Sequence, residues 1–408
     1  MALLKKIFGE WRGDWRRPEV LLVLMTLAMP LSFSTWMALL NNFAIERAAF
    51  TGVEIGILQS LREIPGFLAF AVVFLLFLVR EQTLGLISLL ILGVGTAVTG
   101  LFPSVLGLYI TTVIMSLGFH YYETVRQSLV LQWVDKKDAP HFMGQLIAVG
   151  SFSSLIAFAL IWLALDVGKF NMTWVYMLGG GLTVAIVLFC KLAFPTFPEK
   201  VEQNRKLFLR PRYWLFYLLT FMAGARRQIF VVFAGFLMVE KFGFDAAAIT
   251  LMFLANGALN IFFAPLIGKL IGHWGERKAL TFEYIGLICV FSAYAFVDTA
   301  WVAVLLYIAD HLFFAMAIAI KTYFQKIADP ADFASTAGVS FTINHIAAVI
   351  IPVLFGLLWV ISPSYVFLAG AGMSVLSLVL ALLIPAAPSP ENVALVGPYR
   401  TAVSEAAE

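Results

Sequence analysis

The sequence predicts an all-α polytopic membrane protein, with twelve transmembrane helices forming two pseudo-symmetric six-helix bundles. Of the 408 residues, 62% are hydrophobic and only 12% are charged, far from the composition of a soluble globular domain. Apolar runs with short polar breaks repeat from Val20 to Ile384, and each run is too continuous for the alternating strands of a membrane barrel. One long hydrophilic stretch, residues 194–212, separates the runs into two sets of six.

Each apolar run is long enough to cross a bilayer as a helix. The polar breaks place the predicted spans at residues 19–45, 52–79, 82–102, 104–133, 139–166, 170–194, 211–240, 245–272, 277–297, 299–327, 331–361 and 363–385. We therefore expect five regions: an interfacial segment (1–18), an N-terminal bundle (19–194), a central loop (195–210), a C-terminal bundle (211–385) and a disordered tail (386–408).

The distribution of lysine and arginine among the predicted loops sets the expected orientation of the chain in the membrane. The predicted outer loops hold only Arg47, Lys169 and Lys241, whereas the inner loops hold most of the other lysines and arginines. This asymmetry predicts that both termini, the central loop and the tail are cytoplasmic, as in a multi-pass protein of the bacterial inner membrane. The net charge of +3 is small beside the apolar mass, so we expect the lipid bilayer and no nucleic acid as a partner.

The two halves share an internal repeat. A shift of 194 positions places Glu46 and Arg47 on Glu240 and Lys241, after the first span of each half. The same shift places Gly144 on Gly338, after the fourth span of each half. One offset that fits two distant loops without a gap predicts that the bundles are related by pseudo-symmetry, a common construction in secondary transporters.

A motif lies in the loop after the second span of the second half, GKLIGHWGERKAL. Its glycines and basic residues resemble the signature loop of the major facilitator superfamily, although Gly272 occupies the acidic position. The matching residues include Gly268, Gly275, Arg277 and Lys278. The resemblance covers nearly the whole chain but identifies no subfamily.

This resemblance implies a secondary active transporter in which spans one, four, seven and ten face a central cavity that opens alternately to either side. Its partner would be a small-molecule substrate, with protons as the coupling ion, and we expect a monomer. No catalytic or metal-binding motif occurs in the sequence, so we expect no enzymatic activity, no cofactor and no metal.

The adjacent Arg226 and Arg227 lie near the middle of span seven in an otherwise apolar run. Charge at that depth is unfavourable unless it is hydrated or paired, so intramembrane arginines indicate a functional site. Neighbouring residues on a helix project about 100° apart. One arginine could therefore face a bound anion while the other pairs with a carboxylate on a neighbouring helix; alternatively, both are structural.

Other charges inside the spans suggest coupling and pairing roles. Asp310 has no basic neighbour one turn away, which makes it the best candidate to bind and release a proton, and His311 could relay protons. The spacing of Asp310 and Lys321 predicts one shared helix face. The remaining candidates are predicted to form structural or gating pairs. Glu123 is three residues from Arg126 and could pair with it, and Glu123 could also carry protons. Arg62 and Glu63 could pair with partners on the next helix.

The excess of positive charge in spans seven and ten favours a small organic anion, or an amphipathic solute with an anionic group, because arginine binds carboxylate and phosphate in a bidentate manner. The expected substrate-binding residues are Arg226, Arg227, Gln228, Lys321, Trp36, Tyr121, Phe230 and Tyr323. Two alternatives remain open: a drug or sugar transporter of the same superfamily, and a receptor or sensor that binds without transport.

Overall fold

The computed structural model describes residues 15–76, 78–134, 139–198, 209–329 and 333–397. Each predicted span corresponds to a helix or to a run of helical segments in these residues, and the predicted all-α architecture is confirmed. Most of the interfacial segment 1–18, most of the central loop and the end of the tail lie outside the described residues.

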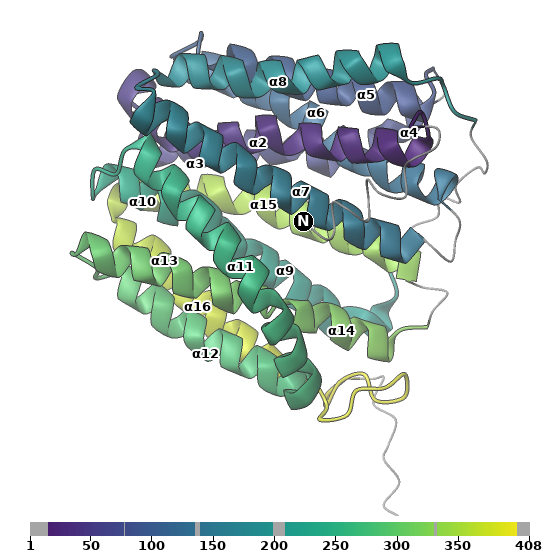
Figure 1. Ribbon diagram of the computed structural model, residues 1–408. Coiled ribbons are helices and arrows are strands. Elements are labelled where there is room, and N and C mark those ends of the chain that lie inside the picture. The colour runs from purple at the N-terminus through teal and green to yellow at the C-terminus, as the bar shows by residue number, and fades with distance from the viewer. Residues whose placement is uncertain (1–14, 77, 135–138, 199–208, 330–332, 398–408) are drawn as a thin grey trace, which may run out of the picture. The chain divides into compact units, whose positions relative to one another are not determined.

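The chain divides into two compact units (Figure 1). Unit 1 consists of Met1–Ala48, Ile64–Asn204 and Ala246–Leu251, and unit 2 of the remaining residues. The units differ from the predicted bundles at two places: the first part of span two belongs to unit 2, and the start of span eight belongs to unit 1. Glycines explain the first difference, since a Cβ atom on Gly56 would lie 2.3 Å from the carbonyl oxygen of Pro352 and 3.1 Å from the Cα atom of Gly356.

Unit 1 is built on closely packed helices. Its elements are α2 (Pro18–Ala48), the end of α3 (Gly52–Phe67), η1 (Leu68–Ala71), α4 (Val72–Leu75), α5 (Glu81–Thr99), α6 (Val105–Trp133), α7 (Ala139–Trp162), η2 (Leu163–Val167) and α8 (Met172–Ala193). Helix α5 packs against both α6 and α8, and α2 packs against α7 and α8. These packed helices form the core of the unit.

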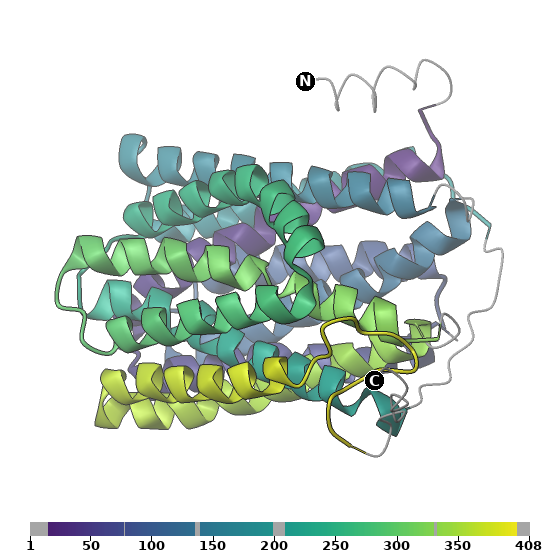
Figure 2. The same cartoon turned by 90° about the horizontal axis from the view of Figure 1, so that it is seen from below.

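Unit 2 contains the start of α3 and the second set of spans. Its elements are η3 (Pro211–Tyr213), α9 (Trp214–Gln228), η4 (Ile229–Ala234), α10 (Gly235–Glu240), most of α11 (Ala246–Trp274), α12 (Glu276–Tyr294), α13 (Ala300–Ala315), α14 (Ile318–Ile327), α15 (Phe333–Ile361) and α16 (Pro363–Leu382). Helix α9 packs against α15 and α16, and α12 packs against α13 and α16. Figure 2 shows the same elements from below.

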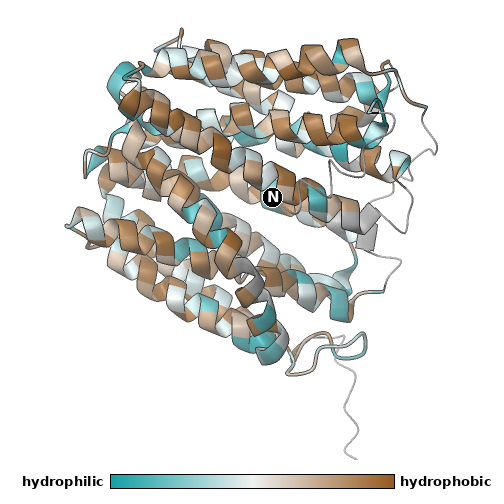
Figure 3. Cartoon of the chain, in the orientation of Figure 1, coloured by the Kyte–Doolittle hydropathy of each residue, from teal (hydrophilic) through white to brown (hydrophobic). Residues whose placement is uncertain are grey.

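In the part of the chain that the structure describes, ten helices are long and apolar enough to cross a membrane. Predicted spans 52–79 and 277–297 are not among them; the first is divided into short segments, and the second carries charges at its start. In Figure 3, hydrophobic residues run along the helices, and hydrophilic residues gather near several helix ends. Many exposed side chains on the helices are apolar, such as Leu192 and Leu106, as expected for surfaces that contact lipid.

Four spans are less regular than the sequence suggested. One of them is span five, which ends in the π-helix η2 (Leu163–Val167). Span two leaves α-helical geometry after Phe67, close to Pro65, whose ring cannot donate the usual helical hydrogen bond. Span seven contains the π-helix η4, directly after Gln228. Span ten is interrupted at Met316 and Ala317, between α13 and α14. Such irregularities occur often at functional sites in transporters and in other proteins.

The expectation of a disordered tail is wrong for residues 386–397. The backbone amide of Leu395 donates to the carbonyl oxygen of Leu383 at 2.9 Å, and Val393 and Ala394 are buried. This segment contains small apolar residues that pack on unit 2. The proline-rich and polar composition of the whole tail concealed this packing from the sequence-based prediction.

Close helix packing in unit 1 predicts a position-specific effect on stability. A Cβ atom at Gly180 of α8 would lie 2.3 Å from the carbonyl oxygen of Gly93 and 2.4 Å from the backbone nitrogen of Ala97. Gly180→Ala should therefore lower the free energy of unfolding by about 1 to 3 kcal/mol. The measurement is the thermal unfolding midpoint of the purified protein.

The neighbouring glycine supplies a matched control. A Cβ atom at Gly181 would have no described atom within 4 Å, so Gly181→Ala should leave the midpoint unchanged or raise it, because alanine favours helix. Equal midpoints for the two variants would contradict this account of the packing.

Candidate functional site in the second unit

A buried ion pair joins spans seven and nine. Arg226 of α9 is 2% exposed, and its Nη2 atom lies 3.8 Å from Oε1 of Glu283 on α12, a fully buried side chain. The Nε atom of Arg226 donates to the carbonyl oxygen of Met222 at 3.2 Å. The guanidinium also lies over the Tyr284 ring, 4.3 Å from its centroid, a favourable cation–π geometry. The structure thus holds Arg226 between a carboxylate and an aromatic face.

Asp310 of α13 belongs to the same cluster. Its side chain is 1% exposed and lies within electrostatic range of both Arg226 and Glu283. Within the described residues, its Oδ2 atom and both carboxylate oxygens of Glu283 lack a hydrogen-bond donor at bonding distance. One buried guanidinium therefore faces two buried carboxylates, which cannot both be neutralised by it. We refer to Arg226, Glu283 and Asp310 as the charged triad.

The internal repeat shows that the triad is specific to unit 2. The shift of 194 positions relates its members to Ser32, Leu89 and Ser116 of unit 1. All three of these residues are fully buried and uncharged, and Ser32 donates a hydrogen bond to Thr183 at 2.8 Å. The same positions of the scaffold are thus neutral in one unit and ionisable in the other, so the scaffold itself does not require the charges.

Arg227 lies on a different side of α9. Its side chain is exposed, in contrast to that of Arg226, and its Cζ atom lies 5.8 Å from the centroid of the Phe314 ring on α13. It is within electrostatic range of Arg62 and Glu63 on α3 and of His311 on α13. The structure therefore separates the two arginines as one prediction anticipated: one pairs with a carboxylate on a neighbouring helix, and the other is accessible.

Asp310 and Lys321 lie on separate helices of span ten. Asp310 is buried on α13, whereas Lys321 is exposed on α14. The backbone forms tighter turns at the interruption, where Met316 and Ala317 donate to carbonyl oxygens three residues earlier. The prediction of a shared face assumed one continuous helix between the two residues, and the structure interrupts that helix.

The aromatic and amide candidates are mostly buried. Trp36, Gln228, Phe230 and Tyr323 have little or no exposed surface, and Tyr121 is partly exposed. The ring of Phe230 contacts that of Tyr307 in a tilted arrangement, with centroids 4.7 Å apart, and its centroid lies 5.9 Å from that of His311. The hydroxyl of Tyr323 donates to a tail carbonyl. Among the predicted substrate-binding residues, Arg227 and Lys321 have exposed side chains in this conformation.

The predicted pair on span four is confirmed, since Nη2 of Arg126 lies 2.8 Å from Oε2 of Glu123. The pair on span two differs in part from the prediction. Arg62 and Glu63 are bonded to each other, and Glu63 additionally lies 3.6 Å from Nε2 of His345 on α15. A carboxylate engaged by several partners fits the predicted structural role of this region.

The signature loop has a conformation that explains one of its glycines. Gly275 precedes α12 and has a φ angle of 78°, a left-handed conformation that glycine adopts without steric strain. The next residue, Glu276, is buried and pairs with Lys326 of α14, whose Nζ lies 2.8 Å from Oε1. This acidic group lies in the first helical turn, where the helix dipole favours negative charge.

Two residues of the site were not predicted. Glu283 is an isolated carboxylate three residues after the signature loop. Its position near the inner end of span nine concealed its role. His345 is a lone histidine in span eleven. An isolated ionisable residue inside a span is itself a signal of function or pairing, and it could have identified both residues.

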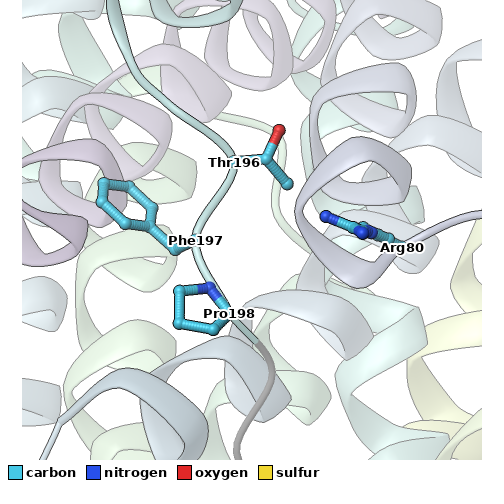
Figure 4. A pocket seen from close by; sticks show the side chains of 4 residues that line it. All are labelled: Arg80, Thr196, Phe197 and Pro198. Atoms are coloured by element: carbon cyan, nitrogen blue, oxygen red, sulfur yellow. The ribbon is translucent and has the colours of Figure 1, made fainter.

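Two described cavities lie in unit 1 and not at the charged triad. A cavity of about 410 Å³ is lined by Arg80, Thr196, Phe197 and Pro198 (Figure 4). A second cavity, of about 250 Å³, is apolar and includes Tyr121 in its lining. Neither contains a residue of the charged triad.

The family sequence model of the Major Facilitator Superfamily matches residues 21–352, which is most of the chain. The chain belongs to this superfamily. The transporter has the superfamily's fold, and its functional class is transmembrane transport of small molecules. No curated protein matches its sequence.

Solved transporters share this fold at low sequence identity. A point mutant of the nucleoside transporter NupG is 16% identical with a TM-score of 0.74, covering 90% of this chain and 99% of that one. A bacterial homolog of the human lysosomal transporter Spinster, inward-facing and occupied, is 15% identical with a TM-score of 0.71, covering 92% and 96%. A POT family transporter in complex with 5-aminolevulinic acid is 12% identical with a TM-score of 0.69, covering 90% and 95%.

The pairing of Arg226 predicts a stability defect that a second mutation relieves. Arg226→Ala leaves buried Glu283 without its cationic partner, which should destabilise the fold by about 3 to 5 kcal/mol. Adding Glu283→Gln removes the unpaired charge and should recover part of that loss. The measurement is the yield of monodisperse protein together with its unfolding midpoint.

Arg126→Ala is the matched control. Arg126 also pairs with a carboxylate, but its side chain is more exposed, so the loss should be smaller. A wild-type yield and midpoint for Arg226→Ala would show that the ion pair does not support the fold.

Proposed function

We propose that this transporter moves a small organic anion, or an amphipathic solute with an anionic group, by proton-coupled alternating access. The observation that carries this proposal is the charged triad of unit 2, where two carboxylates share one arginine while the equivalent positions of unit 1 are uncharged. Ionisable groups inside a membrane are unfavourable and mark ion pathways and proton relays.

The triad is suited to exchange a proton. Arg226 can balance only one of the two carboxylates, so the fully ionised cluster carries one uncompensated negative charge in an apolar interior. Protonation of Asp310 or Glu283 removes that charge. We propose Asp310 as the main proton site, because Glu283 is the closer partner of Arg226, and His311 as a neighbouring relay.

Arg227 is the proposed anion-binding group. It is accessible at the middle of span seven, beside the irregular π-helix η4, and its guanidinium can bind carboxylate or phosphate with two parallel hydrogen bonds. Lys321 adds a second exposed cation on span ten. The buried Trp36, Gln228 and Phe230 would contact the solute only in another conformation of the transport cycle, and Arg226 would act through the triad.

We further propose that the protein is a monomer of the bacterial inner membrane with both termini cytoplasmic. The loop asymmetry of lysine and arginine supports this orientation. In this orientation, the cytoplasmic end of unit 1 is the end with Arg80 and Pro195, and that of unit 2 is the end with Gly275 and Leu383.

Reconstitution tests the proposed class of substrate. Pure protein in liposomes, with an inward proton gradient, should accumulate one or more compounds from a panel of labelled organic anions, and dissipating the gradient should abolish accumulation. Uptake of sugars or cationic drugs alone would instead support the alternative substrate classes. Binding of an anion without uptake or counterflow would support the receptor alternative.

Substitution of Arg227 should weaken the binding of the anion identified in that panel. Arg227→Ala is expected to reduce binding free energy by about 2 to 5 kcal/mol, the range for loss of one partner of a desolvated charge pair. Arg227→Lys should recover only part, because lysine keeps the charge without the bidentate geometry. Equilibrium binding to purified, monodisperse protein gives the values. The control Arg47→Ala removes an exposed arginine outside the site. Wild-type affinity in both Arg227 variants would refute the proposed anion site.

Asp310→Asn should abolish accumulation driven by a proton gradient while leaving exchange down a solute gradient, since the amide cannot bind and release the coupling proton. Uptake and counterflow in the same proteoliposomes distinguish the two activities. Asp166→Asn, at an exposed carboxylate paired with Lys169, should retain both. If Asp310→Asn keeps wild-type dependence on the proton gradient, Asp310 is not the coupling site.

A further inference from the structure

The segment after the last span folds back onto unit 2. We name residues 385–397 the C-terminal strap; it is the yellow segment that leaves α16 in Figures 1 and 2. The backbone amide of Leu395 donates to the carbonyl oxygen of Leu383 at 2.9 Å. Val393 is 2% exposed and Ala394 is 3% exposed. The strap is therefore packed on the unit at its predicted cytoplasmic end.

Two side chains from other elements hold the strap. The hydroxyl of Tyr323, a fully buried residue of α14, donates to the carbonyl oxygen of Val393 at 2.6 Å. Nη2 of Arg212, next to the start of span seven, donates to the carbonyl oxygen of Pro390 at 2.6 Å. Both bonds are made to strap backbone, so they fix its path. Through them the strap connects span ten to the start of span seven.

Helix α14 is held on further sides. Its Lys326 pairs with Glu276 at the start of α12, at 2.8 Å. The ring of Phe324 stacks on Phe216 of α9, with centroids 4.3 Å apart. The interruption at residues 316–317 separates this fixed helix from α13, which carries Asp310. Span ten thus consists of a half that bears the triad and a half clamped at the end of the unit.

Unit 1 contains an equivalent arrangement. The segment after its sixth span is held by Gln82, whose Nε2 donates to the carbonyl oxygen of Pro195 and whose Oε1 accepts from the amide of Phe197. The Phe197 ring contacts Trp133 near the end of α6, at 5.4 Å between centroids. In each unit, the segment that follows the sixth span covers the end of the fourth.

A second contact recurs at the same ends. Gln132 donates to Glu81 at 2.8 Å in unit 1, and the shift of 194 positions places Lys326 on Gln132. Lys326 bonds Glu276 in unit 2. Each fourth span therefore bonds an acidic residue in the first turn of the helix that forms the third span. The recurrence of both contacts, with different side chains, indicates that anchoring this helix end is a requirement of the architecture.

We propose that the C-terminal strap is a latch that holds α14 at the end of unit 2, so that its release frees α14 while α13 stays in place. The interruption at residues 316–317 is the hinge between the two halves of span ten. Helix α14 also carries Lys321, a residue of the proposed anion site, but the latch does not depend on that proposal and can be tested without any solute.

Hydrogen exchange followed by mass spectrometry tests the latch on the purified full chain. Tyr323→Phe removes the hydroxyl that holds Val393 and keeps the ring. Amide exchange should become about fivefold faster in peptides covering α14 and the strap, the factor expected when one hydrogen bond is lost from an opening equilibrium. Exchange in α13 should remain at its wild-type rate.

Two further variants complete the experiment. Tyr365→Phe makes the same change at an exposed tyrosine of α16 and should leave exchange in α14 unchanged. A chain ending at Pro385 should accelerate exchange in α14 at least as much as Tyr323→Phe. Wild-type exchange in α14 for both Tyr323→Phe and the shortened chain would overturn the proposal, as would equal acceleration in α13 and α14. If the shortened chain does not fold, Tyr323→Phe alone decides.

Discussion

The placement of an arginine in the middle of an apolar span is the constraint on which unit 2 depends. A guanidinium in that environment must be paired, and the pairing determines which helices pack around it. Arg226 reaches Glu283 on α12 and faces the ring of Tyr284, while Asp310 on α13 lies within range of its charge. Spans seven, nine and ten are thereby joined through one buried group. In unit 1 the positions that correspond to the triad are held by the uncharged Ser32, Leu89 and Ser116.

The irregular segments of unit 2 lie around this cluster. The π-helix η4 begins directly after Gln228, two residues beyond Arg226. Span ten is interrupted six residues after Asp310. A π-helix inserts an extra residue per turn and rotates the side chains that follow it, and an interruption allows two halves of a helix to move separately. Arg226 and Asp310 thus lie close in sequence to the irregular backbone segments of spans seven and ten.

The ends of the helices are fixed by a different set of interactions. The C-terminal strap and the segment after span six accept hydrogen bonds at backbone carbonyl oxygens from the side chains of Tyr323 and Gln82, respectively, whereas the members of the triad interact through their charges. Charge pairs can be rearranged by a proton, but buried hydrogen bonds to backbone carbonyls need an opening of the strap itself. The two kinds of contact therefore respond to different events, one at the middle of the span and one at its end.

Sequence alone determined the membrane environment, the helical spans, the repeat and the superfamily resemblance, because continuous hydrophobicity and loop charge are local properties of the chain. It also identified Arg226, Arg227 and Asp310 as unusual, since charge inside an apolar run is visible without a structure. Tertiary structure decided which arginine is buried, that Glu283 completes the triad, that span ten is interrupted between Asp310 and Lys321, and that the strap is ordered. Each of these depends on contacts between distant segments or on local backbone geometry, and the spacing of residues along one helix encodes neither of them.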